Sequence, residues 1–114
     1  MLAISAISSQ AFTQVGKDKL KVLFEGIEKE PLSEAVNSPV MDYSPVISSD
    51  GKALFFIRNN DPNNVGSRKN HEDVWFSVFE NGAWSKAQNM GAPVNNIDNN
   101  YPNSISPDNN SILL

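Results

Sequence analysis

Residues 43–56 read YSPVISSDGKALFF, and residues 101–114 read YPNSISPDNNSILL. The two stretches align without a gap at an offset of 58 residues. The identical pairs are Val36 with Val94, Asn37 with Asn95, Tyr43 with Tyr101, Ile47 with Ile105, Ser48 with Ser106 and Asp50 with Asp108. Self-similarity at a fixed period indicates a repeat architecture. We therefore expect a first repeat at about 36–93 and a second, shorter one at 94–114.

Local patterns within the first repeat predict four strands. A short β-branched run at 45–48 and an apolar run at 53–58 flank a tight turn, in which Gly51 supplies a positive φ. An aromatic run at 73–79 predicts a third strand, and an Asn-Gly hairpin signal leads into a fourth at 83–88. Four antiparallel strands per repeat are typical of a β-propeller blade. The prediction is an all-β fold with one complete blade and the start of a second, a fragment of a larger propeller.

The first copy resembles the PD40 or WD40-like (TolB-like) β-propeller repeat, whose core is S-P-D-G-K-x-L-x-F. Residues 73–77 are similar to the D-I-W-x-S strand of that family, and residues 84–95 to its W-S-x-P-x-N-L-G-x-P-I-N stretch. The residues that carry the repeat motif are Tyr43, Pro45, Ser48, Asp50, Gly51, Trp75, Trp84, Tyr101, Ser106, Pro107 and Asp108. The chain departs from the motif at Ser49, where the family has Pro, and at Asn109 and Asn110, where it has Gly-Lys.

Composition excludes several functional classes. The 114 residues include no Cys and one His, and the formal net charge is −4. A chain without Cys has no disulfide framework and no thiolate zinc site. Nucleic-acid affinity depends on clustered Lys and Arg, and the nine basic residues here are scattered. No run of apolar residues is long enough for a membrane span.

The N-terminal segment predicts export. Residues 1–14 are apolar and uncharged, and Ala11 closes a small-x-small sequence of the kind that signal peptidase cuts. An apolar N-terminal strand or helix is the alternative. In the charged lead-in at 15–34, the apolar spacing from Leu20 to Ile27 favours an amphipathic helix, although a short strand also fits. The family resemblance likewise implies an exported protein of Bacteroidetes-type bacteria, in the periplasm or at the outer membrane.

The loop before the third strand is the best candidate ligand site, because long loops carry function on propeller faces. Its candidate residues are Asn59, Asp61, Asn63, Asn64 and His71. The amide and carboxylate oxygens could bind calcium, but Val65 breaks the EF-hand pattern, so no cofactor is expected. His71 is expected to be exposed in a loop tip, without a nucleophile nearby.

The remaining motif residues have structural interpretations. Asp50 and Asp108 are expected to cap turns by accepting backbone N–H groups two residues on. Trp75 and Trp84 are expected to fill the core of the blade.

These observations favour a non-catalytic binding or scaffold module of the cell envelope, with a protein or an envelope component as its partner. Two alternatives stay open. The chain could be the propeller portion of an envelope hydrolase, peptidase or glycosidase whose catalytic part lies elsewhere. It could also be a small β protein that oligomerises to complete its sheets, because the strand from Ser111 to Leu114 is expected to present an unpaired apolar edge through which the chain could self-associate.

Overall fold

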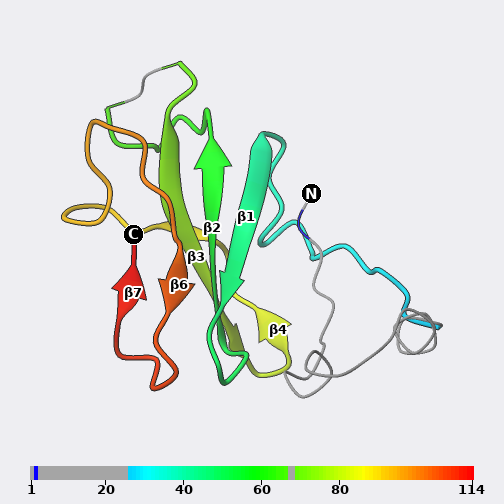
Figure 1. The fold of residues 1–114 in the computed structure, drawn as a ribbon. Helices are drawn as coiled ribbons and strands as arrows, with labels where there is room; N and C mark the ends of the chain where they lie inside the picture. The colour runs from blue at the N-terminus through cyan, green and yellow to red at the C-terminus, as the bar shows by residue number, and fades with distance from the viewer. Residues whose placement is uncertain (1, 3–25, 67–68) are drawn as a thin grey trace, which may run out of the picture.

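The computed structural model describes residue 2, residues 26–66 and residues 69–114, and every regular element in these ranges is a strand. The strands are β1 (Met41–Ile47), β2 (Ala53–Asn59), β3 (Glu72–Glu80), β4 (Ala83–Trp84), β5 (Gln88–Asn89), β6 (Ser104–Ile105) and β7 (Ile112–Leu113). All pairings between strands are antiparallel. The predicted all-β antiparallel fold is therefore confirmed, with one sheet of five strands and a separate β6–β7 hairpin (Figure 1).

The large sheet is a meander in the order β1-β2-β3-β4. The apolar run of β2 lies at its centre, where β3 pairs with it continuously from Ala53 opposite Val78 to Asn59 opposite Glu72. A central strand that is covered on both faces is expected to be nearly all apolar. In β2 the side chains of residues 54 and 56–58 are buried accordingly.

The fourth strand differs from the prediction, because it is broken into β4 and β5 along one edge of β3. Ser85 causes the break: its Oγ accepts a hydrogen bond of 3.0 Å from the Val78 N–H. The Ser77 hydroxyl in turn donates to the Ser85 carbonyl at 2.6 Å. The Ser85 N–H still donates to the Val78 carbonyl at 2.8 Å, but the Ala87 N–H turns to the Ala35 carbonyl of the segment at residues 31–39 at 2.7 Å. Pairing with β3 resumes at Gln88.

Strand β1 begins at Met41, four residues before the predicted start at 45. Its pairing with β2 slips between Tyr43 and Val46, and Ser44 adopts a positive φ of 52°. Pro45 lies in this irregular stretch, where its missing N–H costs no ladder hydrogen bond. The bulge therefore explains how a proline is accommodated inside a strand.

The β6–β7 hairpin repeats the turn between β1 and β2. In the first turn Gly51 has φ 72°, and in the second Asn109, 58 residues later, has φ 60°. The Ser48 N–H donates to the Ala53 carbonyl at 2.8 Å, and the equivalent bond from Ser106 to Ser111 measures 2.9 Å. The start of a second copy of the unit is therefore present at the predicted register.

The two faces of the large sheet are covered by different parts of the chain. One face, called here the lead-in face, carries Leu54, Phe56 and Trp75, which pack against Val36 of the segment at residues 31–39. The other face carries Phe55, which stacks on Phe76 at a centroid distance of 6.3 Å. The β6–β7 hairpin lies on this second face, called here the repeat face, where Ile105 and Ile112 line a hollow with Phe55 and Val78.

Part of the N-terminal prediction cannot be followed in the structure. The leader at 1–14, with its cut after Ala11, lies outside the described residues except for Leu2, as does the lead-in at residues 15–25. Residues 26–30 contain no helix. Among the residues that the structure describes, no helix is long and apolar enough to cross a membrane.

Candidate functional site

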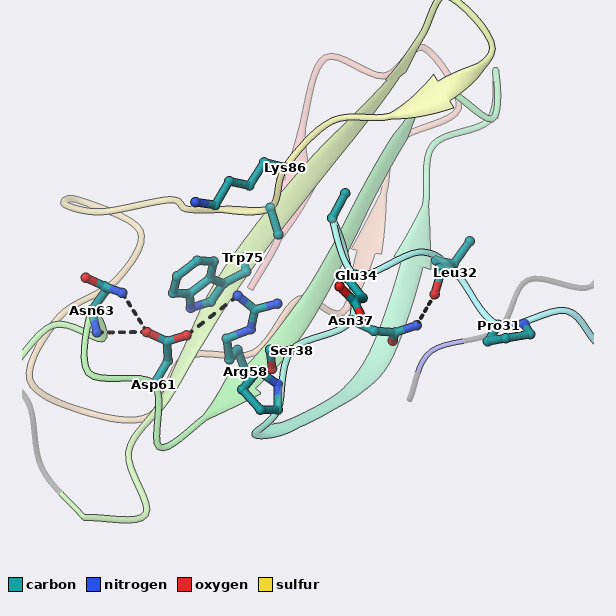
Figure 2. Close-up of a pocket in the computed structure, with 13 residues that line it drawn as sticks. Pro31, Leu32, Glu34, Asn37, Ser38, Arg58, Asp61, Asn63, Trp75 and Lys86 are labelled. Carbon is teal, nitrogen blue, oxygen red and sulfur yellow. Dashed lines mark hydrogen bonds and ion pairs between the residues drawn. The ribbon is translucent and has the colours of Figure 1, made fainter.

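A groove of about 760 Å³ lies beside the lead-in face. Figure 2 shows it between the strands of the sheet and the segment at residues 31–39. Its floor is formed by Arg58 and Trp75, and exposed Glu34 and Lys86 contribute to its lining. The groove therefore combines the aromatic surface of Trp75 with two acidic and two basic side chains, Glu34, Asp61, Arg58 and Lys86.

Arg58 is the buried cation at the centre of this groove, with 6% of its surface exposed. Its Nε donates to Asp42 Oδ1 at 2.7 Å and its Nη2 to the Val36 carbonyl at 2.7 Å. The guanidinium stacks over the Trp75 ring at 4.3 Å, and its Nη1 lies 3.6 Å from Asp61 Oδ2. A buried charge requires such pairing. Arg58 therefore joins the sheet to the lead-in segment and fixes the groove floor.

Trp75 and Asn64 tie the loop between β2 and β3 to the sheet. The Trp75 indole N–H donates to Asn64 Oδ1 at 2.9 Å. The Asn64 amide donates to the carbonyls of Arg58 and His71, each at 2.9 Å. Both polar atoms of the Asn64 side chain thus make hydrogen bonds inside the protein, so this residue holds the loop against the sheet.

The other loop candidates are also engaged. Asp61 accepts hydrogen bonds from the backbone N–H and the amide of Asn63, at 2.8 and 2.9 Å, and faces the Arg58 cation. Asn59 lies elsewhere and donates to Glu72 at 3.0 Å. The structure therefore does not bring the candidate oxygens together around one point. Within the described residues no group of three His, Asp or Glu side chains could hold a metal ion.

The expectation that His71 is exposed was wrong, because only 3% of its surface is accessible. Its Nε2–H donates to the Asp98 carbonyl at 2.8 Å and lies 3.6 Å from Asp73 Oδ1. The loop before β6 closes over the ring through Asp98, a contact 27 residues away that local polarity does not reveal. His71 therefore anchors one loop to another.

Glu72 joins the equivalent tyrosines of the two repeats. Tyr43 donates its hydroxyl proton to Glu72 Oε1, and Tyr101 donates to Oε2 at 2.5 Å. Burial raises the pKa of Glu72, but the hydrogen bonds from Tyr101, Tyr43 and Asn59 outweigh it and hold the pKa below its ordinary value. The carboxylate is therefore ionised at neutral pH and acts as a clamp between repeats.

The Tyr43 hydroxyl makes the stability of this clamp sensitive to alkaline pH. Burial, and then the hydrogen bond to Glu72, raise the pKa of Tyr43 to about 12 from 10.0. The unfolded chain loses this proton first, so the contribution of Tyr43 is complete below pH 10 and is lost as the pH rises towards 12. In urea unfolding across this range, wild type should lose more stability than Tyr43→Phe. Equal losses of stability with pH in the two proteins would contradict the raised pKa of Tyr43.

The turn aspartates occupy equivalent places in the two repeats. Asp50 Oδ1 accepts the Lys52 N–H at 3.0 Å, and Asp108 Oδ1 accepts the Asn110 N–H at 3.1 Å. Hydrogen bonds from Ser48 Oγ and from the Lys52 N–H lower the pKa of Asp50. Each carboxylate therefore closes its own turn, which is the geometry expected from the turn chemistry.

The two turns also contact each other. The Ser49 Oγ donates to the Pro107 carbonyl at 2.8 Å and approaches Asn109 Oδ1 at 2.9 Å. The Ser49 backbone N–H donates to the same Asn109 oxygen at 3.0 Å. Proline at position 49 would supply neither donor, and glycine at 109 would supply no side-chain acceptor. The departures from the repeat motif at Ser49 and Asn109 are therefore complementary.

The two tryptophans contribute to the core as expected, though unequally. Trp75 is 5% exposed and belongs to the buried cluster. Trp84 is half-buried, packs against the edge of that cluster and lies 5.3 Å from the Phe79 ring.

Sequence reasoning missed Arg58, Glu72 and Asn95 as residues that organise the site. Arg58 lies one residue before the end of β2 and Glu72 begins β3, and a charged residue near a strand end is common. Asn95 did have a signal, because it is identical to Asn37 at the repeat offset. Its side chain is buried and pairs with both backbone groups of Val74 at 2.9 Å.

Comparison with protein-family models, with curated proteins and with solved structures finds no match. The groove and the contacts between the two repeats are therefore the features of this chain that bear on its function.

Proposed function

We propose that the chain is a non-catalytic binding and scaffold module of the bacterial cell envelope, in which PD40-type propeller blades stack face to face. The contact between the two equivalent turns is the observation that carries this proposal. Ser49 donates its backbone N–H to Asn109 and its hydroxyl to the Pro107 carbonyl, and the β6–β7 hairpin lies on the repeat face. A repeat that docks its next copy in this way is built for assembly.

The buried polar contacts of Arg58 and Glu72 support the scaffold role. The guanidinium of Arg58 is paired with Asp42, Val36 and Asp61, so its role is to order the surface. Glu72 is likewise saturated by hydrogen-bond donors. The Arg58 guanidinium and the Glu72 carboxylate therefore hold strands and loops together, as expected in a scaffold.

A single experiment tests both the stacking and the export. The chain has no Cys, so the double variant Ser49→Cys/Asn109→Cys carries only the introduced thiols. We expect these thiols to form a disulfide, because the side chains they replace approach to 2.9 Å. In a bacterial host the disulfide should form without added oxidant, since the periplasm is oxidising, and the recovered protein should begin at Phe12.

The control variant Ser49→Cys/Asn60→Cys places its second thiol at the opposite end of β2, beyond reach. Failure of the 49–109 pair to oxidise in the purified protein would refute stacking of the repeats. Oxidation of the purified protein but not of the protein in cells, with Met1 retained, would refute export while leaving the stacking intact.

A further inference from the structure

Asn37 and Asn95 hold two different segments in the same way. Asn95 Oδ1 accepts the Val74 N–H, and its amide donates to the Val74 carbonyl. Asn37 Oδ1 accepts the Leu2 N–H at 2.6 Å, and its amide approaches the Leu2 carbonyl at 3.4 Å. Each asparagine therefore binds the main chain of one residue at two points. Leu2 therefore pairs with Asn37 of the first repeat as Val74 of strand β3 pairs with Asn95 of the second.

Leu2 is also held through its side chain. Its exposed fraction is 3%, and it belongs to the buried cluster that contains Val36, Phe56 and Trp75. The Leu32 N–H donates to the Leu2 carbonyl at 3.3 Å, which adds a third contact to its backbone. An apolar side chain in a pocket, with main-chain hydrogen bonds beside it, is the way in which proteins recognise an extended peptide strand.

Room for a longer segment lies next to this position. Asn37 and Leu32 line the groove of about 760 Å³, together with Trp75 and Lys86. Figure 2 shows Asn37 directed towards the Leu32 carbonyl, to which its amide donates at 2.5 Å. The asparagine is thus fixed in orientation before any other residue binds to it.

We propose that Asn37, with the adjoining groove, is a receptor for an extended peptide strand of another polypeptide, anchored by one leucine-sized side chain, and that Leu2 is its occupant in cis. The inference rests on the proposed binding function and names its ligand class. Two features select this ligand. Both asparagines hold a residue by its backbone, and both held residues, Leu2 and Val74, are apolar and buried. Cleavage after Ala11 would remove Leu2 and leave the receptor open.

The test uses the full chain and a synthetic peptide. In the variant Leu2→Asp the cis occupant should leave, because a carboxylate is not tolerated in the apolar cluster. Titration with acetylated, amidated MLAISA should then shift the NMR signals of the Asn37 amide and change the Trp75 fluorescence saturably. Wild type should bind the same peptide more weakly, since Leu2 competes. The peptide with Asp in place of Leu should not bind.

Substitution of Asn37 distinguishes specific peptide recognition from nonspecific apolar binding. In the Leu2→Asp background, Asn37→Ala should weaken peptide binding about tenfold, as expected for the loss of a pair of backbone hydrogen bonds. The matched control Asn103→Ala, at an exposed residue outside the groove, should leave the affinity unchanged.

Failure of the Leu2→Asp chain to bind the peptide, or equal binding by the Asn37→Ala chain, would overturn the inference. Hydrogen exchange of the Leu2 amide in wild type provides a second measurement if Leu2→Asp does not fold. This amide should be protected, and excess peptide should speed its exchange; an unprotected amide, or exchange unaffected by peptide, also contradicts the inference. A chain that forms the 49–109 disulfide but binds no peptide would refute the receptor and leave the proposed scaffold standing.

Discussion

Replacement of Arg58 by alanine is expected to lower the free energy of unfolding by roughly 3–5 kcal/mol. The substitution leaves the Asp42 carboxylate, whose side chain is 1% exposed, without its cation. It also removes the guanidinium from the Trp75 ring and a hydrogen bond from the Val36 carbonyl. Breaking a buried pair by removing one partner costs more than the pair contributes, because the remaining charge stays desolvated.

Chemical denaturation followed by Trp fluorescence measures this effect, with Lys86→Ala as the control. Lys86 lines the same groove but is exposed, so its removal should change stability by no more than about 0.5 kcal/mol. Arg58→Met keeps much of the apolar stem while removing the charge, and it should still destabilise the protein because Asp42 stays unpaired. A loss below about 1 kcal/mol for Arg58→Ala would mean that the pair is solvated, contrary to its burial.

The repeat and its turns were the part of the fold that the sequence could predict. Gly51 is needed where the backbone is left-handed, and Asn109 takes the same conformation in the second copy, because Asn tolerates it better than most residues. Asp50 and Asp108 bond to backbone two residues on, which depends only on neighbours in the chain. Such local rules can be read from a short window of sequence.

The features that the sequence did not predict depend on side-chain contacts between one element and another. Arg58 follows an apolar run and is expected from the sequence to be a solvated residue at the strand end. It is buried instead, because its partner Asp42 comes from β1, 16 residues earlier. His71 sits in a polar stretch and is buried because the loop carrying Asp98 covers it. The break in the fourth strand depends on Ser85 reaching β3 with its side chain. None of these contacts follows from hydrophobic periodicity.

Replacement of Asn95 by alanine is expected to cost about 2–4 kcal/mol, because a buried donor is left without a partner and a space opens beside it. The side chain is 1% exposed and binds the backbone N–H and carbonyl of Val74. It also donates to Asn89 Oδ1 at 2.8 Å. The Val74 carbonyl keeps a hydrogen bond from the Met90 N–H, so the main loss falls on the Val74 N–H. Urea denaturation measures the difference.

The comparison of Asn95→Ala with Asn37→Ala separates what the equivalent asparagines do. Asn37 is half-buried, so solvent can satisfy the Leu2 backbone groups that its removal releases. Its loss should therefore cost clearly less than the loss of Asn95, and exposed Asn103→Ala should cost nothing measurable. Equal losses at Asn37 and Asn95 would mean that Leu2 is as integral to the fold as β3, and therefore not an exchangeable occupant. A large loss of stability for Asn95→Ala with a small loss for Asn37→Ala is the expected result. It would show that Asn95 forms a permanent junction with β3, whereas Asn37 forms a receptor whose occupant can exchange.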